Sequence, residues 1–203
     1  AKVDALNEII TVESKAMGDD IRVVVVTDFE KTSATALVEG VLDDEAGGAI
    51  AVFRALVSHP AGDTLDPVLM TGSTVLVDDE LIDRFIARAE EWARSRDLEI
   101  EFIDIIHDGY HEIRGKGKNW IPRYYSLMIT EFFQEGLTRC IVGTRGLLGE
   151  GWDASRINVL IDMTTVTTSM SINQLRGRSI RLDSMWPEKV ANNWDIICLA
   201  EEF

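Results

Sequence analysis

The chain has 203 residues, 46% of them hydrophobic, and its 35 acids against 20 lysines and arginines give a net charge of −15. That length suits one domain with a sizeable core. No apolar run approaches the roughly 20 residues that a membrane helix needs, so we expect no membrane contact. The sequence starts at Ala1 without a signal peptide and stops at Phe203, and we expect both ends to be cuts in a longer protein.

The negative charge is confined to the first half of the sequence. Residues 1–109 hold 24 acids and 9 basic residues, a net of −15, whereas residues 110–203 hold 11 of each, a net of zero. A strongly acidic chain does not attract nucleic acid through its overall field. Any contact with a polyanion therefore needs local basic clusters, and these lie in the second half.

The hydrophobic pattern predicts helices alternating with short buried strands. We expect helices at residues 1–16, 48–57, 79–94, 124–133 and 170–181, and strands at 21–26, 67–71, 98–106, 139–142, 157–161 and 194–199. Asp78 or Asp79 is expected to cap the helix that follows, and Gly136 to end the helix before it. The alternation predicts an α/β fold with a doubly wound, mostly parallel sheet and helices on both faces.

Two cysteines, Cys140 and Cys198, lie in apolar strand-like runs. Two thiols without further partners are typical of reduced core residues, and they favour a cytoplasmic protein.

Residues 107–120 are polar, glycine-rich and basic, and they predict a hairpin or a small insertion. Basic residues here interleave with aromatic ones: Arg114, Lys116, Lys118 and Arg123 with Tyr110, Trp120, Tyr124 and Tyr125. Such a mixture suits a nucleic-acid strand, through phosphate contact and base stacking. A basic hairpin whose aromatic side chains pack beneath it explains the composition equally well.

The same region raises the question of a metal site, because it contains Asp104, His107, Asp108, His111 and Glu112. The two histidines are four residues apart and would share a face only on a helix. Gly109 and the preceding strand disfavour a helix, so we expect no metal site.

The segment Gln174-Leu-Arg-Gly-Arg-Ser-Ile-Arg181 places three arginines within six residues of an otherwise acidic chain. Arg178 and Arg181 are three apart and are expected on one face of a helix, where two guanidinium forks suit a polyphosphate. Gln174 lies one turn earlier, and Gly177 permits a close approach to a neighbour or a ligand. The alternative is a solvated basic helix face.

A glycine-rich loop follows the strand at 139–142. It reads Val142-Gly-Thr-Arg-Gly-Leu-Leu-Gly-Glu-Gly-Trp-Asp153, and its four glycines allow backbone N–H groups to approach an anion. Ligands of open α/β sheets bind at the carboxyl ends of strands, where this loop is expected. A glycine-rich surface turn is the simpler interpretation.

A second loop, Thr71-Gly-Ser-Thr74, follows the strand at 67–71 and is expected to lead into the helix at 79–94. The β-branched run Val23–Val26 ends at Thr27-Asp28. In chain order, these four segments resemble motif IV (23–28), the T-G-x-T loop (69–74), motif V (142–153) and motif VI (174–181) of superfamily 2 helicases and translocases.

The resemblance covers most of residues 1–203 and is to the second, C-terminal RecA-like domain of that superfamily. The E-G-x-D and Q-x-x-G-R forms are closer to the restriction-enzyme, UvrB and XPB-like branch than to DEAD-box proteins. The spacing from Thr144 to Asp153 is one residue longer than in the commonest pattern. No G-x-x-x-x-G-K-T/S phosphate loop occurs in the sequence, and Thr74-Val-Leu-Val-Asp-Asp-Glu80 only mimics a Walker B strand.

This resemblance implies an ATP site shared with an N-terminal RecA-like domain of the same polypeptide, which would hold most of the Mg²⁺ contacts. It implies that Arg178 and Arg181 reach the terminal phosphate and that Gln174 orders the attacking water. Gly151, Asp153 and Gly177 would lie near the nucleotide. Nucleic acid, DNA in preference to RNA, would contact Thr144, Gly72 and Thr74 and the basic residues Arg114, Lys116 and Lys118.

By this resemblance the isolated chain is expected to be inactive as an ATPase. A different class of function stays open: a non-catalytic RecA-like module that binds nucleic acid or a protein. A nucleotide-binding regulator without a nucleic-acid role is the third interpretation.

Overall fold

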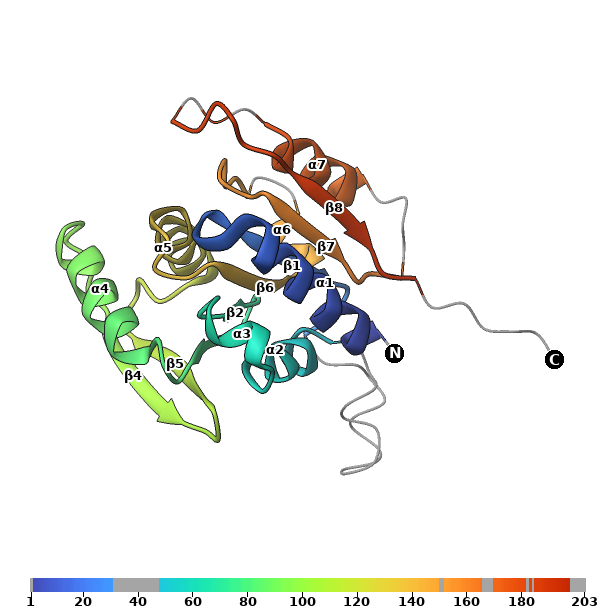
Figure 1. The fold of residues 1–203 in the computed structure, drawn as a ribbon. Coiled ribbons are helices and arrows are strands. Elements are labelled where there is room, and N and C mark those ends of the chain that lie inside the picture. Colours follow the sequence, from blue (N-terminus) through green and yellow to red (C-terminus); the bar gives the residue numbers. More distant parts are fainter. Residues whose placement is uncertain are drawn as a thin grey trace.

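An eight-stranded sheet organises the part of the chain that the computed structural model describes: residues 2–30, 48–149, 152–165, 170–181, 183 and 185–197 (Figure 1). The strand order is β4-β5-β3-β2-β6-β1-β7-β8. The strands are β1 Val23–Thr27, β2 Val68–Met70, β3 Val75–Asp78, β4 Glu101–Ile106, β5 Tyr110–Lys116, β6 Cys140–Thr144, β7 Val159–Asp162 and β8 Asn192–Asp195. The helices are α1 Lys2–Met17, η1 Gly18–Asp20 (a 3-10 turn), α2 Ala49–Val57, α3 Pro60–Asp63, α4 Ile82–Arg94, α5 Pro122–Glu135, α6 Arg145–Leu148 and α7 Met170–Ser179.

Five neighbouring strands of the sheet run parallel. β1 pairs with β6 and β7, β2 pairs with β6, and β8 pairs with β7, all in parallel register. β3, β5 and β4 extend the sheet beyond β2 with antiparallel pairings. The predicted α/β fold with a mostly parallel sheet is confirmed, and the topology is consistent with a RecA-like domain.

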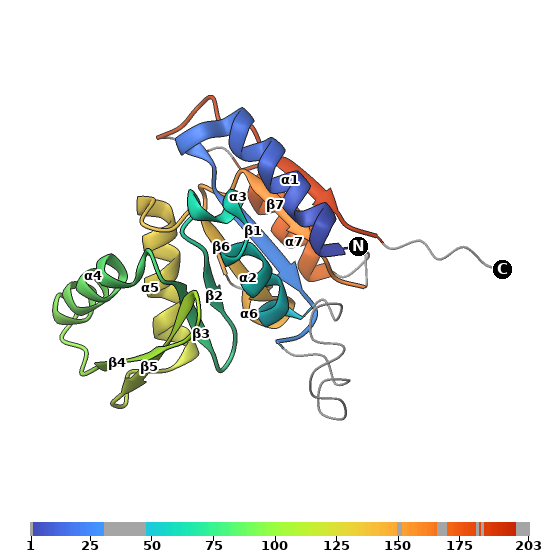
Figure 2. The same cartoon turned by 60° about the horizontal axis from the view of Figure 1, so that its bottom comes forward.

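Helices cover both faces of the sheet, as Figures 1 and 2 show from two directions. Val24 and Val26 of β1 belong to one hydrophobic cluster, together with side chains of α4, α5 and α7. Val23 and Val25 belong to the other, together with side chains of α1 and α2. Successive strand residues point to opposite faces, so the valine run is buried on both sides. A continuous apolar strand, as predicted here, is typical of a covered parallel sheet.

Local signals place the ends of α5 correctly. Pro122 occupies the first turn, where its missing N–H is not needed. Gly136 follows the helix with a φ of 87°, a left-handed conformation that favours glycine. A Cβ at this position would lie 2.6 Å from the Arg22 guanidinium, which reaches into the same corner. The predicted helix end at Gly136 is confirmed.

The prediction that Asp78 or Asp79 caps α4 is wrong. α4 starts at Ile82, its N-cap is Leu81, and no side chain caps it. Asp78 is instead the last residue of β3, and its Oδ1 accepts a hydrogen bond from the Glu80 N–H at 2.9 Å. The acid stabilises the turn after the strand and not the first turn of the helix.

The loop at Thr71–Thr74 precedes a helix, as expected, but an additional strand, β3, lies between them. Thr71–Thr74 form the turn of a β2–β3 hairpin, in which Met70 pairs with Val75 and Val68 with Val77. The apolar run that follows the turn completes the sheet because both of its faces are covered: Val75 and Val77 pack in one hydrophobic cluster and Leu76 in the other.

The predicted hairpin around residues 107–120 is confirmed as β4–β5, and β5 pairs with β3, so the hairpin continues the sheet. At the end of the chain, α7 stops at Ser179, two residues before Arg181. The last strand among the described residues is Asn192–Asp195, which starts two residues before the predicted strand at 194–199; residues 198 and 199 lie outside the described part. Cys140 is a free, fully buried thiol whose pKa burial raises to about 12, as expected of a reduced core residue; Cys198 lies outside the described residues.

Candidate functional site

Two arginines of the 174–181 segment converge on the connection between β6 and β7. Arg178 Nη1 donates to the carbonyl oxygen of Gly149 at 2.8 Å, and Arg181 Nη1 lies 3.4 Å from Asp153 Oδ2. The fold thus joins the predicted arginine pair to the predicted glycine-rich loop. The expectation that both arginines project from one helix face is wrong, because Arg181 lies past the end of α7.

Neither of these two arginines has a buried acidic partner among the described residues. The Arg181 and Asp153 side chains are 59% and 58% exposed, so water screens their attraction. Arg178 is partly buried, and its partner at Gly149 is a neutral carbonyl. Among the described residues Arg178 forms no ion pair. Both guanidinium groups can therefore turn to a stronger external anion.

The third arginine of the cluster has a different role. Arg176 Nη2 lies 2.6 Å from Asp195 Oδ1 and 3.4 Å from Asp162 Oδ2, and Asp162 is only 3% exposed. These contacts tie α7 to the ends of β7 and β8. Ser179 Oγ adds a hydrogen bond to Asn193 Oδ1 at 2.8 Å. Arg176 is thus held by the fold, and two of the three clustered arginines are left for a ligand.

Gln174 and Gly177 lie on an exposed side of α7, while Leu175 between them is buried in the core. A Cβ added at Gly177 would meet no atom within 4 Å. Packing within the described chain therefore does not require glycine at this position. Gly151 lies outside the described residues.

The predicted nucleic-acid loops meet at one edge of the sheet. β2, β6 and β1 are parallel, with Met70 opposite Gly143 and Thr27 opposite Thr144. Thr144 and the turn containing Gly72 and Thr74 therefore both follow the carboxyl ends of adjacent strands, which is where open α/β sheets bind ligands.

A carboxylate that the sequence did not point to lies on this edge. Glu30, three residues past β1, accepts hydrogen bonds from three hydroxyl groups of the 71–74 turn. Thr71 Oγ1 and Ser73 Oγ donate to its Oε2, and Thr74 Oγ1 donates to its Oε1, each at 2.6 Å. Burial, and then the negative charge of Glu30, raises the pKa of the neighbouring Tyr125 to about 12.

The basic side chains of the β4–β5 hairpin are paired with glutamates. Their salt bridges are Arg114–Glu112 at 2.6 Å, Lys116–Glu101 at 3.3 Å and Lys118–Glu99 at 3.7 Å. The side chains of Arg114, Lys116 and Lys118 are 62–76% exposed, so these ion pairs are screened by water and leave the cations accessible to a phosphate. β5 pairs with β3 through residues 110–112, so its later residues extend past the start of β3, toward the edge that carries the 71–74 turn.

The aromatic residues around this hairpin pack inward. Trp120 makes an edge contact with Phe102 and a tilted contact with Tyr125 at 5.1 Å, and it covers Gly115, where a Cβ would lie 2.5 Å from the indole. Tyr125 donates its hydroxyl to the Thr71 carbonyl oxygen at 2.7 Å. The interpretation in which aromatics pack beneath a basic hairpin is confirmed for Trp120 and Tyr125.

The acids and histidines of the hairpin form separate pairs. His111 Nδ1 lies 2.6 Å from Asp104 Oδ1, and His107 Nε2 lies 3.7 Å from Glu112 Oε2. The His107 ring stacks on Tyr110. Within the described ranges no group of three or more His, Cys, Asp or Glu side chains is placed to hold a metal ion.

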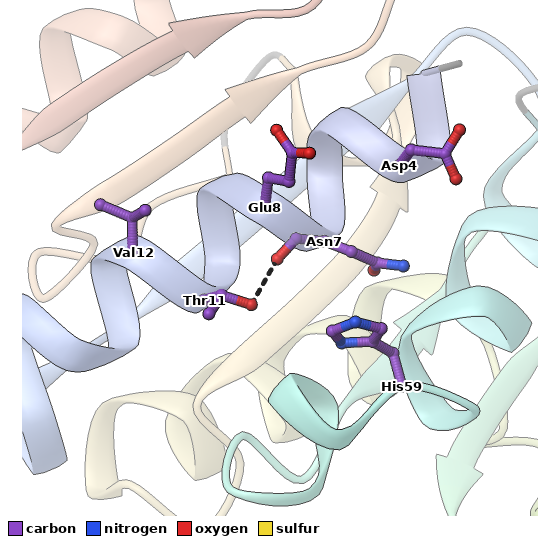
Figure 3. A pocket seen from close by; sticks show the side chains of 6 residues that line it. All are labelled: Asp4, Asn7, Glu8, Thr11, Val12 and His59. Atoms are coloured by element: carbon purple, nitrogen blue, oxygen red, sulfur yellow. Dashed lines mark hydrogen bonds between the residues drawn. The ribbon is translucent and has the colours of Figure 1, made fainter.

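A hollow of about 530 Å³ lies elsewhere, between α1 and the start of α3. Figure 3 shows Asn7 extending from α1 toward His59, with Asp4, Glu8, Thr11 and Val12 along the helix. His59 Nδ1 accepts the Ala61 N–H, which fixes the ring as the cap of α3. None of the predicted nucleotide or nucleic-acid residues lines this hollow.

One sequence signal could have pointed to Glu30. Polar residues that follow a strand of an open α/β sheet lie at its carboxyl end, where ligands bind. Glu30 follows the strand predicted at 21–26, as does Asp28 of the predicted motif IV. Asp28 Oδ2 accepts hydrogen bonds from the N–H and hydroxyl of Thr165, at 2.7 and 2.8 Å, which links the ends of β1 and β7.

In comparisons with protein-family models, curated proteins and solved structures, no match to this chain was found. No helix among the described residues has the length and apolar character needed to cross a membrane.

Proposed function

We propose that this chain is the second RecA-like domain of an ATP-dependent superfamily 2 nucleic-acid helicase or translocase. It would complete an ATP site whose phosphate loop and Mg²⁺ contacts belong to a first RecA-like domain. The observation that carries the proposal is the convergence of Arg178 and Arg181 on the Gly149–Asp153 connection.

The donor set at this convergence fits a polyphosphate. It offers one partly buried guanidinium with a neutral partner and one exposed guanidinium in a screened ion pair. Arginine binds phosphate oxygens bidentately and stays charged at any physiological pH. The open surface over Gly177 leaves room for an approaching group.

In this proposal ATP supplies the phosphoanhydride bond whose hydrolysis drives the motor. Arg181 exchanges Asp153 for the terminal phosphate, and Arg178 binds the same group from the end of α7. Gln174, exposed on the same helix, orients the attacking water. Asp153 and Gly151 belong to the nucleotide side of the site. Arg176 keeps α7 fixed to the sheet while the arginines beyond it change partners.

The nucleic acid, DNA in preference to RNA, binds along the carboxyl edge of the sheet. Gly72, Thr74 and Thr144 contact its backbone there, and Arg114, Lys116 and Lys118 reach it from the β4–β5 hairpin. Closure of the two domains on ATP and their reopening after hydrolysis then moves the enzyme along the strand. We place the enzyme in the cytoplasm.

The test is the ATPase activity of the full-length protein with and without DNA or RNA. We expect Arg181→Ala to lower kcat by roughly 10³-fold or more, because an arginine finger contributes that much to phosphoryl transfer. Lys189→Ala, which removes a cation bonded to the Ser155 carbonyl, is the control and should leave kcat within about twofold.

Two outcomes contradict the proposal. The first is ATP hydrolysis by the isolated chain at a rate that Arg181→Ala does not change. The second is full-length protein without ATPase activity, which would favour a non-catalytic RecA-like binding module.

A further inference from the structure

We infer that Glu30 is an internal competitor for the nucleic-acid phosphate that the Thr71–Thr74 turn binds in the proposed function. The inference rests on the proposed function and adds to it a residue that limits the affinity for nucleic acid.

The first support is the number of donors on one carboxylate. Three side-chain hydroxyls, from Thr71, Ser73 and Thr74, surround the two oxygens of Glu30. Hydroxyl donors at such short distances to a carboxylate form charge-assisted bonds. A phosphodiester likewise presents two anionic oxygens on one centre, and serine and threonine hydroxyls are regular donors to it. The carboxylate of Glu30 thus holds the position that a phosphate would take.

The second support is that the turn keeps its shape through bonds that do not involve Glu30. Thr71 N–H donates to the Thr74 carbonyl oxygen at 2.9 Å, and Thr74 N–H donates to Thr71 Oγ1 at 3.0 Å. The buried hydroxyl of Tyr125 holds the Thr71 carbonyl oxygen. The three hydroxyls therefore stay together when the carboxylate leaves, and a ligand meets preorganised donors.

The third support is access. Gly72 and Ser73 are exposed, and a Cβ at Gly72 would meet nothing within 4 Å, so a strand can approach the turn from solvent. The main chain of Glu30 is fixed by a bond from the Ile50 N–H to its carbonyl oxygen at 3.3 Å. Rotation of the Glu30 side chain then vacates the turn while its backbone stays in place.

Competition and a purely structural role of Glu30 predict opposite results. If the carboxylate only held the hairpin, its removal would lower the stability of the fold without increasing the affinity for any ligand. If it competes, its removal frees three donors and removes one repelling charge, so a phosphate binds more tightly.

The experiment measures the dissociation constant of this chain for a labelled single-stranded oligodeoxythymidylate at low salt. We expect Glu30→Ala to tighten binding roughly tenfold, on the scale of one charge-assisted hydrogen bond. Glu30→Gln, which keeps a neutral acceptor for the hydroxyls, should give a smaller gain. Glu80→Gln removes an equal charge beyond the opposite end of β3 and should change binding by less than about twofold.

The same Glu30 substitution in a variant that lacks two of the hydroxyls distinguishes competition for the donors from a simple loss of negative charge. In Ser73→Ala/Thr74→Val protein, the gain from Glu30→Ala should shrink to about twofold or less, since two of the donors that it frees are absent. A gain that persists in full in this background overturns the inference. Circular dichroism melts show that each variant is folded.

Failure of the inference can be told apart from failure of the proposed function. Wild-type protein that binds the oligonucleotide, with no gain from either Glu30 variant, overturns the competitor while the nucleic-acid role stands. The absence of binding in every folded variant overturns both.

Discussion

Arg176, Arg178 and Arg181 show how three like residues within six positions acquire different roles from their partners. Arg176 lies between two carboxylates, one of them buried, and removal of either side of such a contact leaves a charge uncompensated. Arg178 has a neutral carbonyl, and Arg181 an exposed carboxylate that solvent screens. The contacts of the fold thus distinguish the three arginines, a distinction that charge clustering in the sequence does not contain.

Asp78 gives a prediction about stability and pH. Burial, with further contributions from Asp79 and Asp66, raises the pKa of Asp78 from 3.8 to about 7. The folded chain binds this proton more tightly than the unfolded chain does. Its contribution to stability is therefore complete below about pH 4 and is lost as the pH rises through 7.

We expect Asp78→Asn to raise the free energy of unfolding by about 1–2 kcal/mol at pH 8 and to change it little at pH 4. The asparagine oxygen can still accept the Glu80 N–H. Urea unfolding at both pH values measures the difference. Asp108→Asn, at an exposed hairpin tip, is the control; an equal gain at both pH values would contradict the assignment.

At the scale of elements, the apolar runs could be predicted and their pairing could not. The buried run of β1 and the cap at Gly136 follow from local sequence and are where the sequence predicted them. The helix of the arginine cluster was also predicted, but its end was not, because Ser179 Oγ bonds Asn193 of β8, a residue fixed only by the tertiary fold. The contact of Glu30 with Thr71 spans 41 residues and depends on β6 lying between β1 and β2.

The turn at 71–74 shows the same limit in another form. Its resemblance to the T-G-x-T loop implied a phosphate contact, but the strand that follows it was not predicted. Val75–Val77 becomes a strand because both of its faces meet hydrophobic clusters. The antiparallel return of β3 then brings Thr74 back beside Thr71, and this closes the ring of hydroxyls around one carboxylate.

Gly177 gives a prediction at the scale of helix α7. Glycine inside a helix is less stable than alanine by about 1 kcal/mol, and a Cβ here meets no atom of the described chain. We expect Gly177→Ala to raise the melting temperature of the chain. If the proposed function holds, the same change in the full-length protein should lower ATPase activity, since the methyl group would obstruct a group that approaches this face of α7.

Two measurements on Gly177→Ala check whether stability rises while ATPase activity falls. Thermal melting of the chain gives the first and steady-state ATPase of the full-length protein gives the second. Ser126→Ala, at a half-buried position of α5, serves as a helix control for the first. A Gly177→Ala enzyme with raised stability and unchanged kcat and KM would show that nothing approaches this face of α7.

For the whole molecule, the distribution of charge opposes contact with nucleic acid. The net charge of −15 repels a polyanion at long range. The three cations of the β4–β5 hairpin are each held by a glutamate. Two carboxylate restraints therefore act on the same edge of the sheet: Glu30 on the hydroxyl turn and the glutamates of the hairpin. A strand that binds along this edge would therefore meet carboxylates beside both the hydroxyl turn and the hairpin cations.

The salt dependence of DNA binding measures how many cations of the hairpin contact phosphates. Each cation that contacts a phosphate of a single strand adds about 0.7 to the slope of log K against log salt. We expect the triple variant Arg114→Ala/Lys116→Ala/Lys118→Ala to bind single-stranded DNA more weakly and to lower that slope by about 2. The matched control removes three exposed cations from helices, Lys15, Arg54 and Arg94, and should keep the wild-type slope. Equal slopes for the hairpin variant and the wild type would show that the hairpin cations stay with their glutamates and that the hydroxyl turn binds the strand without them.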